Sequence, residues 1–152
     1  MTQSTVIIGS DHAGFDLKEA IMRHLGETGH EVKDIGTKTR ESCDYPLMAM
    51  ELCDEVLASG HPGILICGTG VGMSMAANRF PGIRAALCTN EYLARMTRAH
   101  NNANVLCLGS RVLGDELAKS IVSVFLTTRF EGERHQRRID MIENLKKTTK
   151  EG

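Results

Sequence analysis

Short apolar runs alternate with longer amphipathic segments along the whole chain. The central runs are apolar at almost every position, as is typical of parallel strands that are buried on both faces. The pattern predicts five strands, at residues 5–9, 31–35, 63–67, 83–88 and 103–108. It also predicts six helices, at residues 15–28, 45–59, 72–80, 91–101, 114–127 and 134–147.

This alternation indicates an α/β fold in which right-handed crossovers place helices on an open parallel sheet. The chain has 152 residues, without an internal repeat or a linker, which fits a single domain over residues 1–152. Residues 36–44 form the one long polar loop. Its sequence is compatible with a flap, although a plain connection is the favoured interpretation.

Composition excludes several function classes. Only four Phe, two Tyr and no Trp are present, so a stacking platform for single-stranded nucleic acid is not expected. The net charge is −1 with interspersed signs, which disfavours a polyanion partner. No apolar stretch approaches the ~18 residues that would cross a membrane, and the first residues do not resemble a signal peptide. Five cysteines without C-x-x-C spacing indicate a reduced, cytoplasmic protein.

Ligands of open α/β sheets bind beyond the carboxyl ends of the strands. This rule selects Asp11 and His12 after the first strand, residues 67–72 after the third, and Arg111 after the last. His100 and Asn101 end the helix that precedes the last strand, so the rule does not place them.

A glycine-rich turn follows the third predicted strand. Its backbone N–H groups lie at a helix N-terminus, where they can hold an anion or a developing oxyanion. The spacing fits neither a dinucleotide fingerprint nor a P-loop. An ordinary turn that permits close packing is the alternative reading. The groups concerned belong to Gly68, Thr69, Gly70, Val71 and Gly72.

Four side chains are candidates for proton chemistry, each with a plainer alternative. Cys67 is either a small buried hydrophobe or a thiol activated by the neighbouring amide dipoles. Thr69 either donates a hydroxyl hydrogen bond into this space or caps the next helix. Asp11 is either an N-cap or, beside His12, an acid–base group. His100 can simply complement a helix dipole.

Arg134 and Arg138 are four residues apart, so they share a helix face on which two guanidinium groups can hold one phosphate. A solvated basic face is the alternative. Residues 134–139 contain no acidic residue to pair with these arginines, and Arg111 adds a further cation. No set of His, Asp and Glu residues has the spacing of metal ligands, so no metal is expected.

Taken together, these residues resemble the type B ribose-5-phosphate isomerases, within the wider family that includes the galactose-6-phosphate isomerase subunits. The resemblance extends from about Val6 to Ile142. It rests on the order and spacing of six motifs: Gly9-Ser-Asp-His-Ala-Gly, Asp44-Tyr-Pro, Gly63-Ile-Leu-Ile-Cys-Gly-Thr-Gly-Val-Gly, His100-Asn, Asn104-Val-Leu-Cys-Leu-Gly-Ser-Arg and Arg134-His-Gln-Arg-Arg.

The resemblance implies a Rossmann-like three-layer α/β/α sandwich with a five-stranded parallel sheet. It implies a homodimer or a dimer of dimers whose active sites lie at the subunit interface, with the C-terminal helix reaching the partner. The implied reaction interconverts D-ribose 5-phosphate and D-ribulose 5-phosphate through an enediol, as in the pentose phosphate pathway. It needs no cofactor, and neither nucleic acid nor membrane takes part.

The resemblance also implies roles for single residues. Cys67 would be the base that moves a proton between C1 and C2, with residues 68–72 and the Thr69 side chain at the enediolate oxygen. His100 would open the furanose ring, and Asp11 would assist at the sugar hydroxyls. The further substrate and phosphate ligands would be His12, Asn101, Arg111, Arg134 and Arg138. Some members use a glutamate in place of the cysteine, so Cys67 places this chain in the thiol branch.

Three other functions are compatible with parts of the sequence. The same chemistry can act on a six-carbon sugar phosphate, such as allose 6-phosphate or galactose 6-phosphate. A thiol hydrolase would use Cys67 as nucleophile and His100 as base, but it leaves the arginines unexplained. A nucleotide-binding module would need a different glycine spacing.

Overall fold

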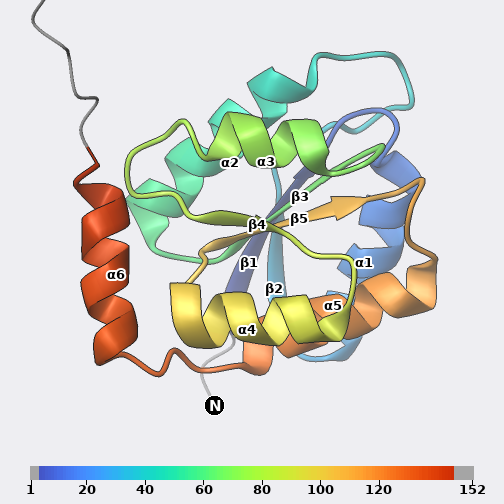
Figure 1. The fold of residues 1–152 in the computed structure, drawn as a ribbon. Helices are drawn as coiled ribbons and strands as arrows, with labels where there is room; N and C mark the ends of the chain where they lie inside the picture. The colour runs from blue at the N-terminus through green and yellow to red at the C-terminus, as the bar shows by residue number, and fades with distance from the viewer. Residues whose placement is uncertain (1–3, 146–152) are drawn as a thin grey trace, which may run out of the picture.

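Five parallel strands form one sheet in the order β2-β1-β3-β5-β4 (Figure 1). The structure is a computed structural model that describes residues 4–145. Its strands are β1 (Thr5–Ser10), β2 (Glu31–Asp34), β3 (Gly63–Cys67), β4 (Ala85–Leu87) and β5 (Val105–Gly109). Its helices are α1 (Phe15–Glu27), α2 (Tyr45–Ser59), α3 (Val71–Ala77), α4 (Glu91–Asn101), α5 (Asp115–Thr127) and α6 (Arg134–Glu143).

Helices cover both faces of the sheet, which confirms the predicted α/β/α sandwich (Figure 1). The central strands β1, β3 and β5 are largely apolar on both faces because each face has its own core. Val6 and Ile8 of β1 pack in a cluster with residues of α1 and α5. Ile7, between them in sequence, packs in the opposite cluster with residues of α2 and α3. The alternating direction of successive side chains in a strand produces this division.

The strand order reverses between β1 and β3, and this switch point is where open α/β sheets bind ligands. Ser10 and Ile66 are register partners there. The backbone N–H of Asp11 extends the pairing by donating to the carbonyl of Ile66 at 3.1 Å. The residues that follow β1 and β3 are therefore neighbours at one edge of the sheet, the carboxyl edge.

Several elements are shorter than the sequence predicts. β4 begins at Ala85 instead of residue 83, because side-chain amides take over the hydrogen bonds of the preceding backbone. Asn78 exchanges two hydrogen bonds with Ala85, at 2.8 and 2.9 Å, and Asn104 accepts one from the N–H of Arg84 at 2.8 Å. α3 ends before Asn78. α6 ends at Glu143 rather than residue 147, which lies outside the described residues.

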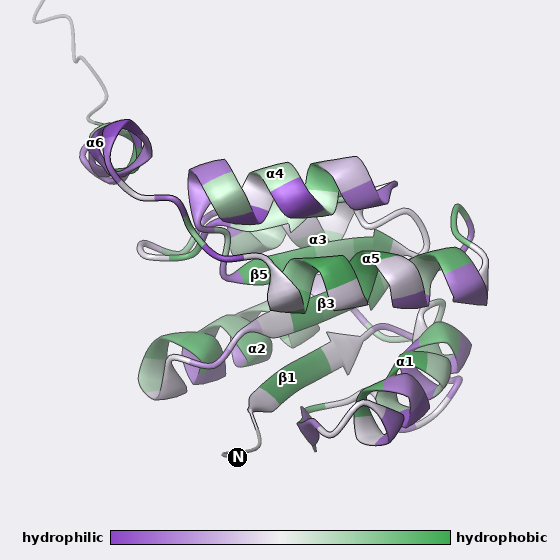
Figure 2. Cartoon of the chain, turned by 90° about the horizontal axis from the view of Figure 1, so that it is seen from below, coloured by the Kyte–Doolittle hydropathy of each residue, from purple (hydrophilic) through white to green (hydrophobic). Residues whose placement is uncertain are grey.

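The last helix lies at one side of the sandwich, where it packs against α4. Figure 2 shows α6 beyond the end of α4, strongly hydrophilic and joined to α5 by an extended segment. It is held by the ion pair of Arg84 with Glu143, whose Nη1 and Oε1 atoms are 2.7 Å apart. Within residues 4–145, no helix combines the length and the apolar character that a membrane crossing requires.

Candidate active site

Three loops meet at the carboxyl edge and are tied to one another by hydrogen bonds. The N–H of Ser110, after β5, donates to the carbonyl of Cys67 at 2.9 Å. The Ser110 hydroxyl donates to the carbonyl of Ala13, after β1, at 2.8 Å. These bonds fix the segments that follow β1, β3 and β5 relative to one another, so the polar groups between them are preorganised.

The thiol of Cys67 lies under the glycine-rich turn. Its side chain is only 5 % exposed, and its Sγ atom accepts a hydrogen bond from the N–H of Gly70 at 3.2 Å. An N–H group that points at sulfur stabilises a thiolate more than a neutral thiol. The cysteine is thus both buried, as the plain reading expects, and hydrogen-bonded in the way that a base requires.

Gly70 must be glycine for steric reasons. Its φ is +80°, and a Cβ atom there would lie 2.6 Å from Leu87 and 2.9 Å from the backbone of Leu108. This conformation turns the Gly70 N–H back toward Cys67 and starts α3. The glycine-rich turn therefore both packs closely and directs its backbone N–H groups, so the two alternative readings of the sequence apply together.

Some of the backbone N–H groups of residues 68–72 already donate hydrogen bonds within the protein. The N–H of Gly70 binds the sulfur, and that of Val71 donates to the Thr69 hydroxyl at 3.2 Å. The Thr69 side chain therefore accepts a bond at the start of α3, although the N-cap position itself is occupied by Gly70. The N–H groups of Gly68, Thr69 and Gly72 have no partner within residues 4–145, and these three remain available to an oxygen of a substrate.

Arg111 lies against the same turn. Its N–H donates to the carbonyl of Gly68 at 2.9 Å, and a Cβ atom on Gly68 would lie 3.1 Å from the Arg111 Nη1 atom. An exposed guanidinium group is thereby held next to Cys67. The structure thus brings this predicted phosphate ligand to the carboxyl edge.

Asp11 and His12 complete this edge. Asp11 is buried, and its Oδ1 atom accepts from the N–H of Gly14 at 3.1 Å, which stabilises the turn before α1. The Nδ1 atom of His12 accepts from the N–H of Cys43 at 3.2 Å. A neutral His12 therefore carries its proton on Nε2 and can donate it to an anion. The same bond ties the loop of residues 36–44 to the site.

Tyr45 is a site residue that the sequence reasoning did not select. It begins α2, yet a Cβ atom on Gly72 would lie 2.6–2.8 Å from the ring and hydroxyl of Tyr45. The tyrosine therefore covers the N-terminus of α3 and remains 39 % exposed. The Asp44-Tyr-Pro motif was the signal available in the sequence.

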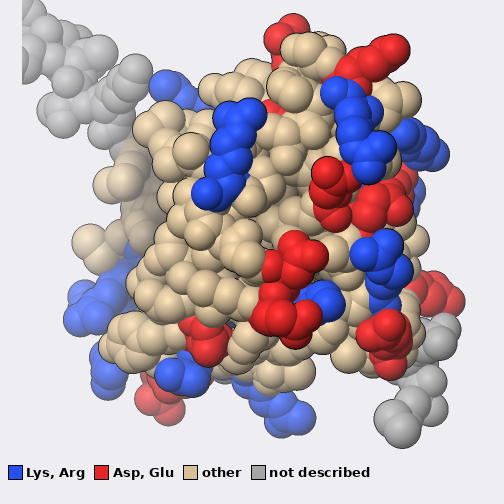
Figure 3. Space-filling view, turned by 90° about the vertical axis from the view of Figure 1, so that its right-hand side faces the viewer, with Lys and Arg blue, Asp and Glu red and all other residues tan. Residues whose placement is uncertain are grey.

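Figure 3 shows the side of the molecule toward which β5 points. Acidic and basic side chains are interspersed on it, and neither sign forms a continuous patch. Recognition of an anion at this edge must therefore come from a few placed groups, such as Arg111 and His12, rather than from a broad positive field.

The other predicted site residues lie at the opposite edge of the sheet, the amino edge. α4 ends at Asn101, just before β5 begins at Val105, whereas Cys67 is the register partner of Gly109 at the far end of β5. The length of β5 alone separates the two edges by about 13 Å. Figure 1 shows α6 and the end of α4 together on the side away from the arrowhead of β5.

His100 is part of a compact cluster at the amino edge. Its ring stacks on that of His135, with centroids 4.2 Å apart and planes inclined by 10°. The Nε2 atom of each ring lies 3.6 Å from Oε2 of Glu131. Burial, followed by the neighbouring charges of His100 and Arg134, lowers the pKa of His135. The backbone of Glu131 is fixed in turn, because its N–H donates to the carbonyl of Ala99 at 3.0 Å.

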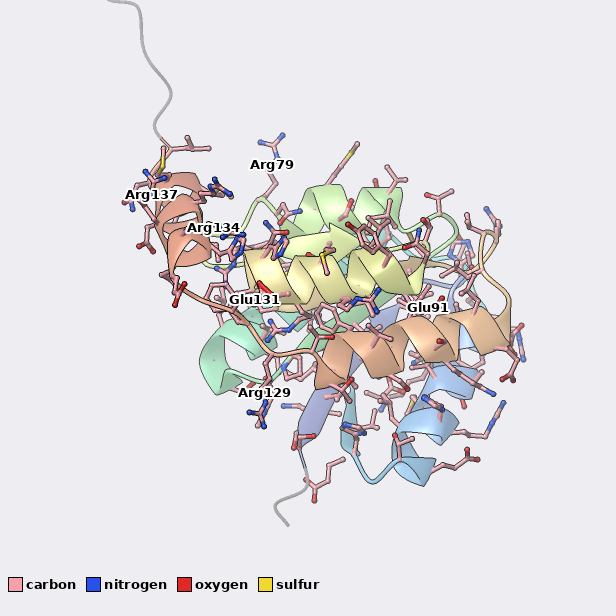
Figure 4. The ribbon with its side chains drawn as sticks, turned by 60° about the horizontal axis from the view of Figure 1, so that its bottom comes forward. Arg79, Glu91, Arg129, Glu131, Arg134 and Arg137 are labelled. Carbon is pink, nitrogen blue, oxygen red and sulfur yellow. The ribbon has the colours of Figure 1, made fainter. Side chains whose placement is uncertain are left out.

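The arginines of α6 are free to bind an anion. Arg134 and Arg138 are exposed, and neither has an ion-pair partner within residues 4–145. Figure 4 shows Arg134 on the side of α6 that faces α4, with Arg137 on the far side. A cavity of about 590 Å³ opens near the C-terminal end of α6; its lining includes Asn101, Arg79, Arg84 and Glu143 but neither of the two arginines.

The predicted residues thus form two groups rather than one. The carboxyl edge brings together Asp11, His12, residues 67–72 and Arg111. The amino edge brings together His100, Asn101 and the first turns of α6, with Arg134 and Arg138. In a single chain, the thiol and His100 do not meet.

Comparisons with known proteins agree with these features. A family model described as Ribose/Galactose Isomerase matches residues 6–142. Ribose-5-phosphate isomerase B of Escherichia coli is 52% identical over 139 residues, which cover 90% of this chain and 93% of that protein.

Solved structures agree in the same way. A ribose 5-phosphate isomerase of Thermotoga maritima superposes with a TM-score of 0.92 and 50% identity, over 95% of this chain and 100% of that one. The Mycoplasma genitalium ribose-5-phosphate isomerase B was solved with bound ribulose-5-phosphate. It superposes with a TM-score of 0.90 and 45% identity, over 98% of this chain and 100% of that one. With its glycine turn, its strand order and nearly its whole length accounted for, this chain belongs to the ribose/galactose isomerase family.

Proposed function

We propose that the protein interconverts D-ribose 5-phosphate and D-ribulose 5-phosphate by proton transfer through an enediol. The observation that carries the proposal is the hydrogen bond from Gly70 N–H to the Cys67 sulfur, in a turn with three further N–H groups free. A buried base beside preorganised oxyanion donors is the arrangement needed to remove a proton next to a carbonyl. The 52% identity to a ribose-5-phosphate isomerase B supports the choice of substrate.

The reaction consists of three proton movements. The Cys67 thiolate removes the proton from C2 of the open-chain aldose, and the electron pair moves to O1, where the N–H groups of Gly68, Thr69 and Gly72 hold the negative charge. A proton then passes from O2 to O1, and the Cys67 thiol protonates C1 to give the ketose. Removal of one oxyanion donor typically costs about 2.7–4 kcal/mol, so these amides account for a substantial part of the rate.

Two copies of the chain complete each site in this proposal. The separation of the two edges supports it, since His100 and the α6 arginines cannot serve the thiol of their own chain. α3 and α4 flank the edge strand β4 (Figure 1), and both expose large apolar side chains there, including Met75 at 67 % and Tyr92 at 62 %. A monomer gains nothing from such exposure, whereas an isologous interface buries it.

The symmetry fits the chemistry. A two-fold axis that crosses the β4 edge perpendicular to the strands reverses the strand direction in the second copy. The amino edge of one chain then lies beside the carboxyl edge of the other. His100 of one copy opens the sugar ring held by Asp11 of the other, and Asn101 binds a hydroxyl. The phosphate is held by Arg134 and Arg138 from one copy and by His12 and Arg111 from the other.

We also propose that residues 1–152 act as one domain in the cytoplasm. All five cysteines are free, and four of them are buried. Unpaired thiols of this kind persist where the cell keeps thiols reduced.

Proton NMR in D₂O tests the activity. Ribose 5-phosphate incubated with the protein should convert to ribulose 5-phosphate, with solvent deuterium entering at the transferred hydrogen. Allose 6-phosphate and galactose 6-phosphate, tested in parallel, should turn over more slowly. Faster turnover of either one would replace the five-carbon assignment with a six-carbon one. Absence of both conversion and exchange with all three sugars would refute the proposed isomerase activity.

A further inference from the structure

The amino edge contains a set of metal-ligand atoms that sequence spacing did not reveal. His100, Glu131 and His135 each place one donor atom so that all three lie within 4.8 Å of one another. Both histidine Nε2 atoms are 3.6 Å from the same carboxylate oxygen, Oε2 of Glu131. Residues 100 and 135 are far apart in sequence, and only the packing of α6 against α4 brings them together.

The donor set matches a known preference. Two imidazole nitrogens and one carboxylate form a His₂Glu set, which zinc uses in open sites that keep a fourth position for another ligand. Zinc bonds of about 2.0–2.2 Å at tetrahedral angles put neighbouring ligand atoms about 3.3–3.5 Å apart. The observed 3.6 Å is therefore close to the spacing that the ion requires.

One movement is needed for binding. A metal lies in the plane of each imidazole that binds it, and the two rings are now nearly parallel, at 10°. His135 is 8 % exposed, so its ring is held in place, and the backbone of Glu131 is anchored while its side chain is 56 % exposed. The side chain of His100 is 40 % exposed and is free to tilt out of the stack.

The surrounding charges limit the affinity. Glu131 supplies one negative charge, while Arg134 lies next to His135 and opposes a dication. The site is also open to solvent on the side of His100. We therefore expect an affinity well below that of a closed structural zinc site.

We propose that His100, Glu131 and His135 bind a divalent transition-metal ion such as zinc, and that the bound ion inhibits the isomerase by occupying Nε2 of His100. The binding half of this proposal stands on geometry alone. The inhibitory half rests on the proposed function, in which His100 opens the sugar ring.

The inhibition has a distinctive form. Ribose 5-phosphate is mostly cyclic and must be opened, whereas ribulose 5-phosphate cannot close a ring through its phosphorylated O5. Exchange of a C1 proton of ribulose 5-phosphate needs the Cys67 base but not ring opening. The ion should therefore slow conversion of ribose 5-phosphate more than it slows this exchange.

Binding is tested first, by titration of the metal-free full-length chain with Co²⁺, followed through visible absorption, and by competition with Zn²⁺. We expect one ion per chain. His135→Phe keeps the ring stack but removes a ligand, and Glu131→Gln keeps the shape but removes the charge. Each should weaken binding by at least about tenfold. His61→Phe, at an exposed position outside the cluster, is the matched control and should bind as the parent chain does.

Inhibition is tested second, by NMR rates with and without Zn²⁺ for each variant, each compared with its own metal-free rate. Protection from zinc in His135→Phe supports the proposal. The proposal is overturned if His135→Phe and Glu131→Gln both bind the metal as tightly as the parent chain. It is also overturned by a thiolate-to-cobalt absorption band, which would indicate binding at Cys67. Equal inhibition of conversion and exchange overturns the inhibitory half. Normal binding by a chain without isomerase activity would leave the site standing and refute the proposed function.

Discussion

The N–H of Gly70 donates to the Sγ atom of Cys67 across three residues of the same turn, at 3.2 Å. The bond joins the two parts of the chemistry, because the turn that exposes the amides is also the turn that polarises the thiol. It further distinguishes Cys67 from the other buried cysteines. Burial raises the pKa of Cys88 to about 11 and that of Cys53 to about 12, so those thiols are neutral at ordinary pH.

Cys67→Ser should remove most of the activity while substrate binding is retained. Loss of a general base typically costs about 10²–10⁴-fold in rate, and a serine hydroxyl is a much weaker base than a thiolate. Deuterium exchange into ribulose 5-phosphate measures the loss, and calorimetric titration measures binding. Cys88→Ala is the control, since it removes a buried thiol of raised pKa and should keep its exchange rate. Exchange by Cys67→Ser at the parent rate would exclude the thiol as the base.

Gly70→Ala should destabilise the fold by about 1–3 kcal/mol, because a non-glycine residue is strained at φ +80° and its Cβ would approach backbone atoms to 2.9 Å. The turn must shift, so the isomerisation rate should fall as well. Gly26→Ala provides the comparison: a Cβ there meets no atom within 4 Å, and alanine favours the helix by up to about 1 kcal/mol. Urea unfolding measures the free energy of unfolding of both variants, which should fall for Gly70→Ala and rise for Gly26→Ala. A Gly70→Ala variant as stable as the parent chain would contradict the steric argument.

Mixed dimers should show that the site is shared. Cys67→Ala and His100→Ala are each expected to be inactive on ribose 5-phosphate. A mixed dimer of the two contains one intact site, so random co-assembly should restore about a quarter of the parent activity. Co-expression with two affinity tags isolates the mixed species. Its failure to regain activity, with both chains folded, would place His100 and Cys67 in separate sites.

Lys18→Met should destabilise the protein strongly. The ammonium group of Lys18 is fully buried and contacts both carboxylate oxygens of Asp34, at 2.8 and 3.0 Å. Its removal leaves that carboxylate without its partner, which typically costs about 3–5 kcal/mol. The exposed pair of Lys33 with Glu55 is the matched control, and Lys33→Met should change stability by less than about 1 kcal/mol. Similar unfolding midpoints for the two variants would contradict this ranking.

His135 should make the fold less stable in mild acid. Burial, then His100 and Arg134, lower its pKa below the ordinary value of about 6.5. The unfolded chain therefore binds this proton more readily than the folded one does, so the free energy of unfolding falls as the pH drops below about 6.5. His135→Phe should flatten that dependence. Urea unfolding between neutral and mildly acidic pH compares the two chains, and parallel curves would refute the assignment.

The sequence predicted the carboxyl edge well because its information there is local. Asp11 directly follows β1, Cys67 ends β3 and Arg111 lies two residues after β5, and parallel strands end at a common edge. The boundaries of β4 were less predictable, since Asn78 and Asn104 replace the ladder with side-chain hydrogen bonds that depend on tertiary contacts.

The amino edge was harder to predict for the same physical reason. The contact of His100 with His135 depends on where the segment between α5 and α6 places α6 against α4. The periodicity of apolar residues in the sequence does not encode that path. Tyr45 was missed because a residue at the start of a helix usually reads as a cap, and its approach to Gly72 exists only in the folded chain.

The separation of the two edges has a consequence for how activity depends on concentration. On the proposed assembly, a folded chain has native secondary structure and a native core but holds only complementary halves of two sites. Dilution below the dimer dissociation constant should then abolish catalysis while circular dichroism stays unchanged. Specific activity would report association rather than folding, and raising the protein concentration alone would recover it.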